Sequence, residues 1–199
     1  MNLAAALWLL ASYLVGAIPT SYIAGRLFRG IDLREHGSKN LGATNVYRTL
    51  GWRYAIPVGL FDIAKGAVPV LVFAPQVSDS QLFALACGIA AILGHVLSVF
   101  VRFRGGKGVA TTLGVWLALS PWAGLAMVAT WAAIAFVFRY SSLAALTVSV
   151  AAPFYVAWFS PGWPYLLAMI VMSATLIFRH RANIRSLLAG TETRIGIKN

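Results

Sequence analysis

The sequence has few charged residues, and acidic residues are the scarcest of them. Of its 199 residues, 11% are charged and 60% are apolar, whereas a soluble globular protein has about 25% charged residues. This shortage nearly excludes a water-soluble fold. The 5 acidic residues face 16 basic ones, a formal net charge of +11. In a soluble protein that excess would suggest nucleic acid as a partner, but here the charges must first be placed relative to a membrane.

Cysteine and an early basic residue are also lacking. Cys87 is the single cysteine, so it cannot form a disulfide within the chain. It lies in an apolar run, and we therefore expect a small buried side chain. No Lys or Arg precedes Arg26, whereas a cleavable signal peptide begins with basic residues. We therefore expect the apolar residues 1–25 to remain as a membrane helix.

Several catalytic signatures are missing as well. There is no G-x-S-x-G nucleophile motif and no dense cluster of His, Cys and carboxylates. None of the three histidines has an Asp five residues later, so the H-x-x-x-x-D catalytic pair common in glycerolipid acyltransferases is absent. Five acids also make paired-carboxylate chemistry implausible. The sequence predicts no metal and no cofactor.

Long apolar runs are abundant, and turn-forming residues divide them near 74–80, 120–122 and 160–164. A helix needs about 20 apolar residues to cross a bilayer. The pattern predicts an all-α integral membrane protein with seven transmembrane helices in one catalytic domain, residues 1–199. The helices are expected at about 3–25, 54–73, 81–101, 109–120, 122–138, 143–159 and 164–178. The fourth is short and either crosses with little tilt, thins the bilayer or is partly re-entrant.

The basic residues indicate how these helices are oriented. Every Lys and Arg except Lys65 falls in alternate connections or after the last helix, and the intervening connections contain none. Loops rich in Lys and Arg are cytoplasmic. The sequence therefore predicts an N-terminus outside and a cytoplasmic C-terminus.

The first of three polar clusters covers residues 37–48. It supplies hydroxyls, amides and two cations without any carboxylate, a composition that suits an anion-binding site. The alternative is a capped loop with ordinary cytoplasmic charges, because Ser, Asn and Thr are common in turns. The substrate-binding candidates here are Ser38, Asn40, Thr44, Asn45 and Arg48.

The second cluster is a glycine-rich segment around Lys107. Gly105, Gly106 and Gly108 could turn backbone N–H groups toward one anion, and the next helix would add the positive end of its dipole. The segment does not match the Walker A pattern G-x-x-x-x-G-K-[ST]. Phosphate binding without nucleotide hydrolysis is the preferred hypothesis, and an ordinary basic hairpin is the alternative.

The third cluster follows the last predicted helix, at residues 179–192. If that helix continues, His180 and Asn183 lie three residues apart on one face and point together into the site. We expect Glu192 to be a structural counter-ion for the surrounding arginines, rather than simply a surface acid.

Two polar features fall inside the predicted membrane helices. Asp62 and Lys65 are three residues apart, so we expect a structural ion pair, with catalysis as the alternative. His95, Ser98 and Arg102 follow a helical spacing and predict a polar stripe leading from the glycine-rich segment, which helix packing would also explain.

The ordered set of clusters resembles the bacterial acyl-phosphate:glycerol-3-phosphate acyltransferase family. Each motif alone is common, but the set covers nearly the whole chain. The matching segments are Gly16-Ala-Ile-Pro-Thr-Ser-Tyr22, Gly37-Ser-Lys-Asn-Leu-Gly-Ala-Thr-Asn45 with Arg48, Asp62-Ile-Ala-Lys-Gly66, Gly94-His95, Phe103-Arg-Gly-Gly-Lys-Gly-Val-Ala-Thr111, and His180-Arg-Ala-Asn-Ile184 with Gly190 and Glu192.

The resemblance implies a multi-pass enzyme of the bacterial inner membrane with its active site facing the cytoplasm. It would transfer a fatty acyl group from acyl phosphate to the 1-hydroxyl of glycerol 3-phosphate, giving lysophosphatidic acid and phosphate in the first step of phospholipid synthesis. The resemblance assigns the glycine-rich segment to glycerol 3-phosphate. It also implies a peripheral acyl-phosphate synthase as a partner, besides the two substrates and membrane lipids, and no nucleic acid.

Acyl phosphate is already an activated mixed anhydride, so this reaction needs no covalent nucleophile and no metal. The expected catalytic residues are Ser38, Lys107, His180 and Asn183. For the base we favour a substrate phosphate over His180, because no acid–base pair accompanies that histidine. A small anion or lipid-phosphate transporter is the alternative function; the absence of repeats and of midplane polar groups argues against it.

Overall fold

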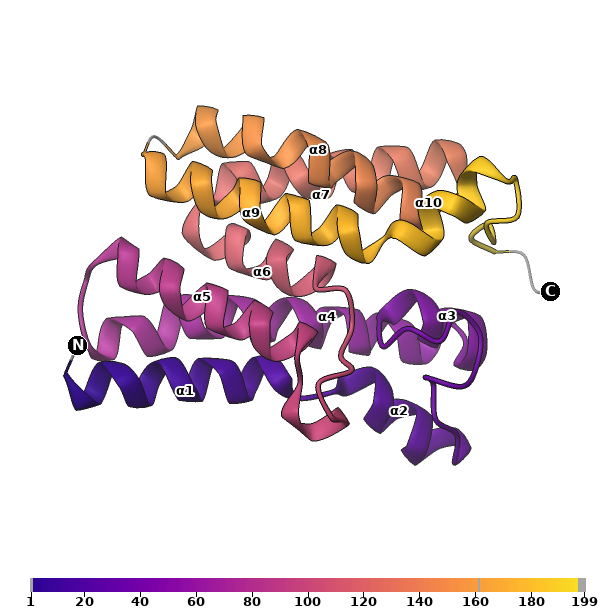
Figure 1. Ribbon diagram of the computed structural model, residues 1–199, viewed down its shortest axis with the longest axis horizontal. Helices are drawn as coiled ribbons and strands as arrows, with labels where there is room; N and C mark the ends of the chain where they lie inside the picture. Colours follow the sequence, from indigo (N-terminus) through magenta and orange to yellow (C-terminus); the bar gives the residue numbers. More distant parts are fainter. Residues whose placement is uncertain (1, 161, 197–199) are drawn as a thin grey trace. The chain divides into compact units, whose positions relative to one another are not determined.

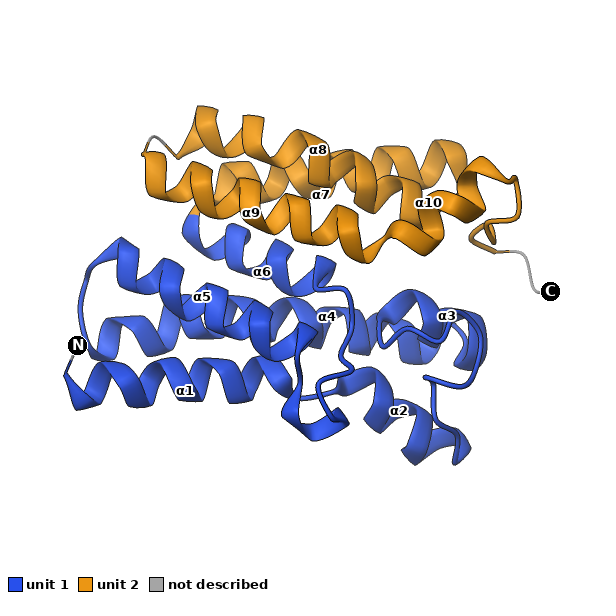
Figure 2. Cartoon of the chain, viewed as in Figure 1, with its two compact units in different colours: residues 1–119 blue, residues 120–199 orange. Residues whose placement is uncertain are grey.

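The computed structural model describes residues 2–160 and 162–196, and within these residues it contains helices and connections but no strand. The chain divides into two compact units, residues 1–119 and 120–199 (Figure 2). Pro161, in the predicted connection at 160–164, and Lys198, after the last predicted helix, lie outside the described residues.

The first unit packs its helices in pairs (Figure 1). α1 lies along α5, and α4 packs against both α6 and the shorter α3. Its elements are α1 (Leu3–Ala17), α2 (Thr20–Arg29), α3 (Ala43–Leu50), α4 (Trp52–Val68), the π-helical turn η1 (Pro69–Phe73), the 3₁₀ turn η2 (Ala74–Gln76), α5 (Gln81–Val96), the 3₁₀ turn η3 (Val99–Val101) and α6 (Val109–Leu119).

Glycines bring these helices into close contact. A Cβ added to Gly16 of α1 would overlap the backbone of Ala91 in α5, and one added to Gly94 of α5 would overlap α1. In the same way, Gly66 of α4 lies against the backbone of Thr111 in α6. Lipid tails are as apolar as Leu side chains, so membrane helices associate through such close backbone packing.

The second unit is a set of long apolar helices with a short terminal one. α8 packs between α7 and α9, and α10 touches both α8 and α9. Its elements are α7 (Pro121–Phe138), α8 (Ser141–Phe159), α9 (Trp163–Arg179) and α10 (Arg181–Leu188).

Five helical segments of the described chain are long and apolar enough to cross a membrane. They are Leu3–Arg29, Trp52–Gln76, Gln81–Val101, Pro121–Phe138 and Ser141–Phe159. The pair Trp163–Arg179 and Arg181–Leu188, bent by 57°, would make a sixth, whereas Val109–Leu119 is shorter. At 1.5 Å per residue α6 is about 16 Å long, roughly half the hydrocarbon thickness. The expectation of an all-helical membrane protein is confirmed, and the count of seven crossings stays a prediction.

Two helices that the sequence predicts as continuous are interrupted or end early in the structure. The helix expected at 3–25 is broken at Ile18 and Pro19, and α2 then continues to Arg29. Proline has no N–H to donate and disfavours a helical conformation for the residue before it. The helix expected at 81–101 ends at Val96. Ser98 and Arg102 therefore do not continue a helical stripe from His95, because a non-helical residue and a 3₁₀ turn intervene.

The last helix, predicted at 164–178, is present as α9, but it does not continue through His180. α9 ends at Arg179 and α10 begins at Arg181, so His180 lies at the bend between them. The condition that placed His180 and Asn183 on one continuous helix is therefore not met. Asn183 belongs to α10, while His180 precedes its first residue.

Candidate functional site

A buried ion pair lies beside the break between α1 and α2. Lys65 Nζ is 2.7 Å from Asp62 Oδ1, and both side chains are 2% exposed. Lys65 also donates to the backbone oxygen of Ile18 at 2.8 Å, and Thr20 Oγ1 donates to Asp62 Oδ1 at 2.6 Å. The predicted pair is thus present, and it connects α4 to the chain on both sides of the break.

The end of α5 adjoins the same break. Ser98 Oγ donates to the backbone oxygen of Ala17 at 2.5 Å, and His95 Nδ1 lies 3.8 Å from Asp62 Oδ1. A small pocket of about 10 Å³, room for one water molecule, opens between these groups. Its lining includes the backbone of Gly105 and Gly106 and five polar residues, Thr20, Ser21, Lys65, His95 and Ser98.

The glycine-rich segment is held against the end of α5. The N–H groups of Gly105 and Gly106 donate to the backbone oxygens of Val96 and His95, each at 3.2 Å. A Cβ on Gly105 would overlap the His95 backbone, and one on Gly106 would overlap the Leu41 oxygen and the His95 ring. These two glycines are therefore required for close packing.

Lys107 and Gly108 connect this packed segment to α6. Gly108 has φ +96°, a conformation in which a side chain would be strained. α6 begins at the next residue, Val109, and the first N–H groups of a helix have no acceptor within it. The anion-attracting end of α6 thus begins two residues after Lys107.

Asn45 organises the other candidate loop. Its side chain is buried; Oδ1 accepts from the Ser38 N–H at 2.8 Å, and Nδ2 donates to the backbone oxygens of Leu33 and His36 at 3.0 and 3.1 Å. Asn45, Thr44 and Arg48 all belong to α3, a helix that the sequence did not predict. Asn40 lies in the loop before it.

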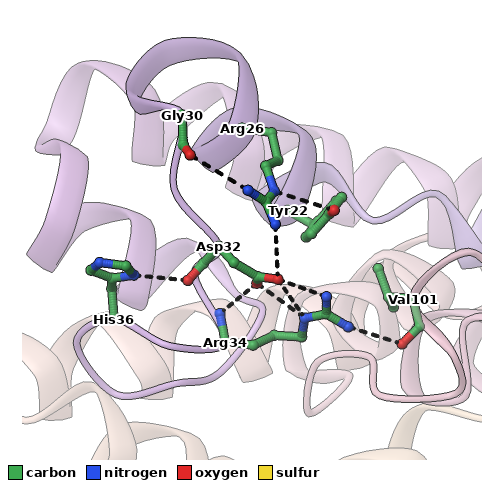
Figure 3. Close-up of polar contacts among 7 residues, drawn as sticks. All are labelled: Tyr22, Arg26, Gly30, Asp32, Arg34, His36 and Val101. Carbon is green, nitrogen blue, oxygen red and sulfur yellow. Dashed lines mark hydrogen bonds and ion pairs between the residues drawn. The ribbon is translucent and has the colours of Figure 1, made fainter.

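Asp32 and Arg34 form a polar cluster that the motifs did not reveal (Figure 3). Asp32 is 6% exposed and accepts hydrogen bonds from Arg34 Nη2 at 2.7 Å and Arg34 Nε at 3.0 Å. These bonds lower the pKa of the Asp32 carboxyl to about 2, although its burial opposes the shift. The sequence does carry a signal for this cluster, because Asp32 is one of few acids and lies between arginines. A buried carboxylate needs such a partner.

In the second unit, His180 is buried and its Nδ1 lies 2.7 Å from the Leu176 oxygen. A carbonyl oxygen only accepts, so Nδ1 carries the proton and Nε2 of the neutral ring is an acceptor. Asn183 Nδ2 donates to the Glu192 carboxylate at 3.1 and 3.2 Å. Glu192 thus contacts Asn183, a partner that its sequence neighbours do not predict.

The structure brings the first two clusters together, since Gly106 lies against Leu41 of the 37–48 cluster. His180 and Asn183 flank the bend of the second unit. Within residues 2–160 and 162–196, no group of three or more His, Cys, Asp or Glu side chains could hold a metal ion.

Comparison with known proteins places these features in a family. The family model described as glycerol-3-phosphate acyltransferase matches residues 6–190. A glycerol-3-phosphate acyltransferase of Herminiimonas arsenicoxydans is 46% identical over 199 residues, covering 98% of this chain and 97% of the relative.

Two crystal structures of PlsY, an integral membrane glycerol 3-phosphate acyltransferase, have the same fold. The glycerol 3-phosphate form has a TM-score of 0.89 and 40% identity, and covers 96% of each chain. The lysophosphatidic acid form has a TM-score of 0.86 and 39% identity, and covers 96% of this chain and 95% of the other. The chain therefore belongs to the glycerol-3-phosphate acyltransferase family and is an acyltransferase, as its motifs predict.

Proposed function

We propose that the protein transfers a fatty acyl group from acyl phosphate to the 1-hydroxyl of glycerol 3-phosphate, releasing lysophosphatidic acid and phosphate. The observation that carries this proposal is the pair of PlsY structures, one in a glycerol 3-phosphate form and one in a lysophosphatidic acid form. Lysophosphatidic acid is glycerol 3-phosphate with an acyl group added to a hydroxyl. An activated donor such as acyl phosphate suits a chain with few acids and no nucleophile motif.

The geometry refines which groups would bind phosphate. The N–H groups of Gly105 and Gly106 already donate to α5, and the Asn45 amide donates to and accepts from its own loop. We assign these three residues to building the loops. The groups proposed to contact phosphate are Lys107, the first turn of α6 and the side chains of Ser38, Asn40, Thr44 and Arg48.

The reaction balances without a further reactant. The 1-hydroxyl oxygen attacks the acyl carbonyl carbon, the bond from that carbon to the phosphate oxygen breaks, and the hydroxyl proton goes to a substrate phosphate. Ser38 and Lys107 stabilise the phosphate charges, while His180 and Asn183 position the reacting groups. When the His180 ring is neutral with its proton on Nδ1, Nε2 can accept a hydrogen bond from a hydroxyl, a role that requires no full proton transfer.

The proposed setting is the bacterial inner membrane. Seven crossings, with α6 as the shortest, would place the N-terminus outside and the C-terminus, the basic loops and the active site at the cytoplasmic face. There a soluble phosphate substrate meets the acyl chain of the donor, and a peripheral acyl-phosphate synthase could deliver that donor.

The test is phosphate release by the purified protein in detergent, supplied with acyl phosphate and glycerol 3-phosphate. We expect release that depends on both substrates. Lys107→Ala should raise the KM for glycerol 3-phosphate, whereas Arg29→Ala, which removes an exposed positive charge at the end of α2, should leave it unchanged.

Detergent micelles offer no second compartment, so turnover there rejects the alternative of a protein that acts only as a transporter. No phosphate release would contradict the proposed reaction. An unchanged KM in Lys107→Ala would contradict the phosphate assignment.

A further inference from the structure

The cluster of Asp32 and Arg34 links the loop that leads to Ser38 with the 3₁₀ turn that precedes the glycine-rich segment. The carboxylate of Asp32 accepts from the Arg34 guanidinium and also from the Arg34 backbone N–H at 3.0 Å (Figure 3). A two-pronged pair of this kind fixes the orientation of an arginine as well as its position. The lowered pKa of Asp32, about 2, keeps this carboxylate ionised well below neutral pH.

The oriented guanidinium reaches a segment far along the chain. Arg34 Nη1 donates to the backbone oxygen of Val101 at 3.3 Å, across 67 positions of sequence. Val101 is buried and precedes the glycine-rich segment by three residues. Arg34 also stacks over the Tyr22 ring of α2, with its central carbon 5.1 Å from the ring centre. These contacts tie the loop of residues 31–42 to the 3₁₀ turn that leads into the glycine-rich segment.

The same loop is anchored on its other side by Asn45, which bonds to the backbone of Leu33, His36 and Ser38. Leu33, between Asp32 and Arg34, is fully buried in the apolar cluster that also contains Val101. Ser38 therefore follows a stretch of backbone that is held from two directions.

We propose that Arg34, oriented by Asp32, is a positioning residue that sets the spacing between the two loops that bind the phosphate groups of the substrates. This role rests on the proposed function of those loops. Arg34 acts through them, since its guanidinium donates to Asp32 and Val101. Misplacing a binding group by about 1 Å can cost up to about 100-fold in rate, so a loosened loop should be visible in the kinetics.

The decisive variant is Arg34→Lys, which keeps the charge but loses the planar fork that engages Asp32 and Val101 together. We expect the KM for glycerol 3-phosphate to rise roughly tenfold, with a melting temperature close to that of the wild type. Asp32→Asn should raise the same KM, and the double variant should add little, because the two residues act as one unit. Arg29→Lys, the same exchange at an exposed arginine at the end of α2, is the matched control.

The proposal is overturned if Arg34→Lys and Asp32→Asn keep a KM and a kcat within twofold of the wild type, or if Arg29→Lys raises the KM equally. A loss of activity that disappears on cooling would also overturn it, because it would reflect only stability. Lys107→Ala separates the two hypotheses: a raised KM there with normal Arg34 variants rejects the positioning role alone. An unchanged KM in Lys107→Ala rejects the phosphate assignment on which that role rests.

Discussion

At the scale of the residue, the chemistry of a side chain leaves its role open. The amide of Asn45 suits an anion site, yet in the structure it is buried and bonded to the backbone of its own loop. Ser38 contributes its N–H to the same network, which leaves its hydroxyl as the group proposed for the substrate. The same donors that recognise phosphate also satisfy buried carbonyl groups, and only the fold decides between the two.

His180 provides the residue-scale test of the proposed proton transfer. General-base catalysis contributes up to about 10⁴-fold in rate. If a substrate phosphate accepts the proton, His180→Ala should lower kcat by less than this factor, because only positioning is lost. Single-turnover rates and substrate binding should be measured together, and the acidic limb of the pH–rate profile should persist in the variant. A larger loss of kcat with unchanged binding, or loss of that limb, would identify His180 as the base.

The pair of Asp62 and Lys65 is a second residue-scale test. Asp62→Leu leaves a buried ammonium unpaired, and such a change costs about 3–5 kcal/mol of stability. Adding Lys65→Met removes that charge, so thermal unfolding in detergent should show the double variant recovering most of the loss. We also expect it to keep most of its activity. A double variant that is stable but inactive would contradict the structural role and favour a catalytic one.

At the scale of the element, the breaks between helices are also where distant segments are joined. The break after α1 presents the oxygens of Ala17 and Ile18, which accept from Ser98 and Lys65. The end of α5 accepts from Gly105 and Gly106, and the end of α9 bonds to His180. Carbonyl groups at helix ends within a membrane protein need such partners, so the polar residues near the breaks have both structural and functional uses.

Gly106 tests the packing of the glycine-rich segment on α5. Gly106→Ala places a Cβ against the Leu41 oxygen and the His95 ring, so the backbone must shift and kcat/KM for glycerol 3-phosphate should fall by roughly 100-fold. Gly59→Ala is the matched control, since its Cβ would lie 3.4 Å from the Ala43 Cβ, an ordinary van der Waals contact. Wild-type kinetics in Gly106→Ala would show that this close approach is not needed.

At the scale of the whole molecule, the distribution of charge predicts how the chain crosses the membrane. Cys87 is buried and is the single cysteine, so Cys87→Ala gives a background without thiols. On that background, Ser78→Cys should react with an impermeant maleimide in intact spheroplasts, and Arg53→Cys only after permeabilisation. Both positions are exposed. The opposite labelling pattern would reverse the orientation predicted from the basic residues.

The sequence by itself determined the membrane class, the gathering of basic residues in alternate connections, the polar clusters and the family. These follow from apolar runs, charges and short motifs, which are local properties of the chain. It also placed most long helices to within a few residues, because a helix forms its backbone hydrogen bonds within its own segment.

Only the tertiary structure decided how the polar residues are used. It showed α3, the breaks at Pro19 and His180, the hydrogen bonds by which Asn45 holds its loop, and the link from Arg34 to Val101. The bonds that define these features join residues far apart in sequence: 81 positions separate Ser98 from Ala17, and 47 separate Lys65 from Ile18. A local pattern carries no information about such partners, because they meet only when the helices pack and leave a carbonyl or a charge to be satisfied.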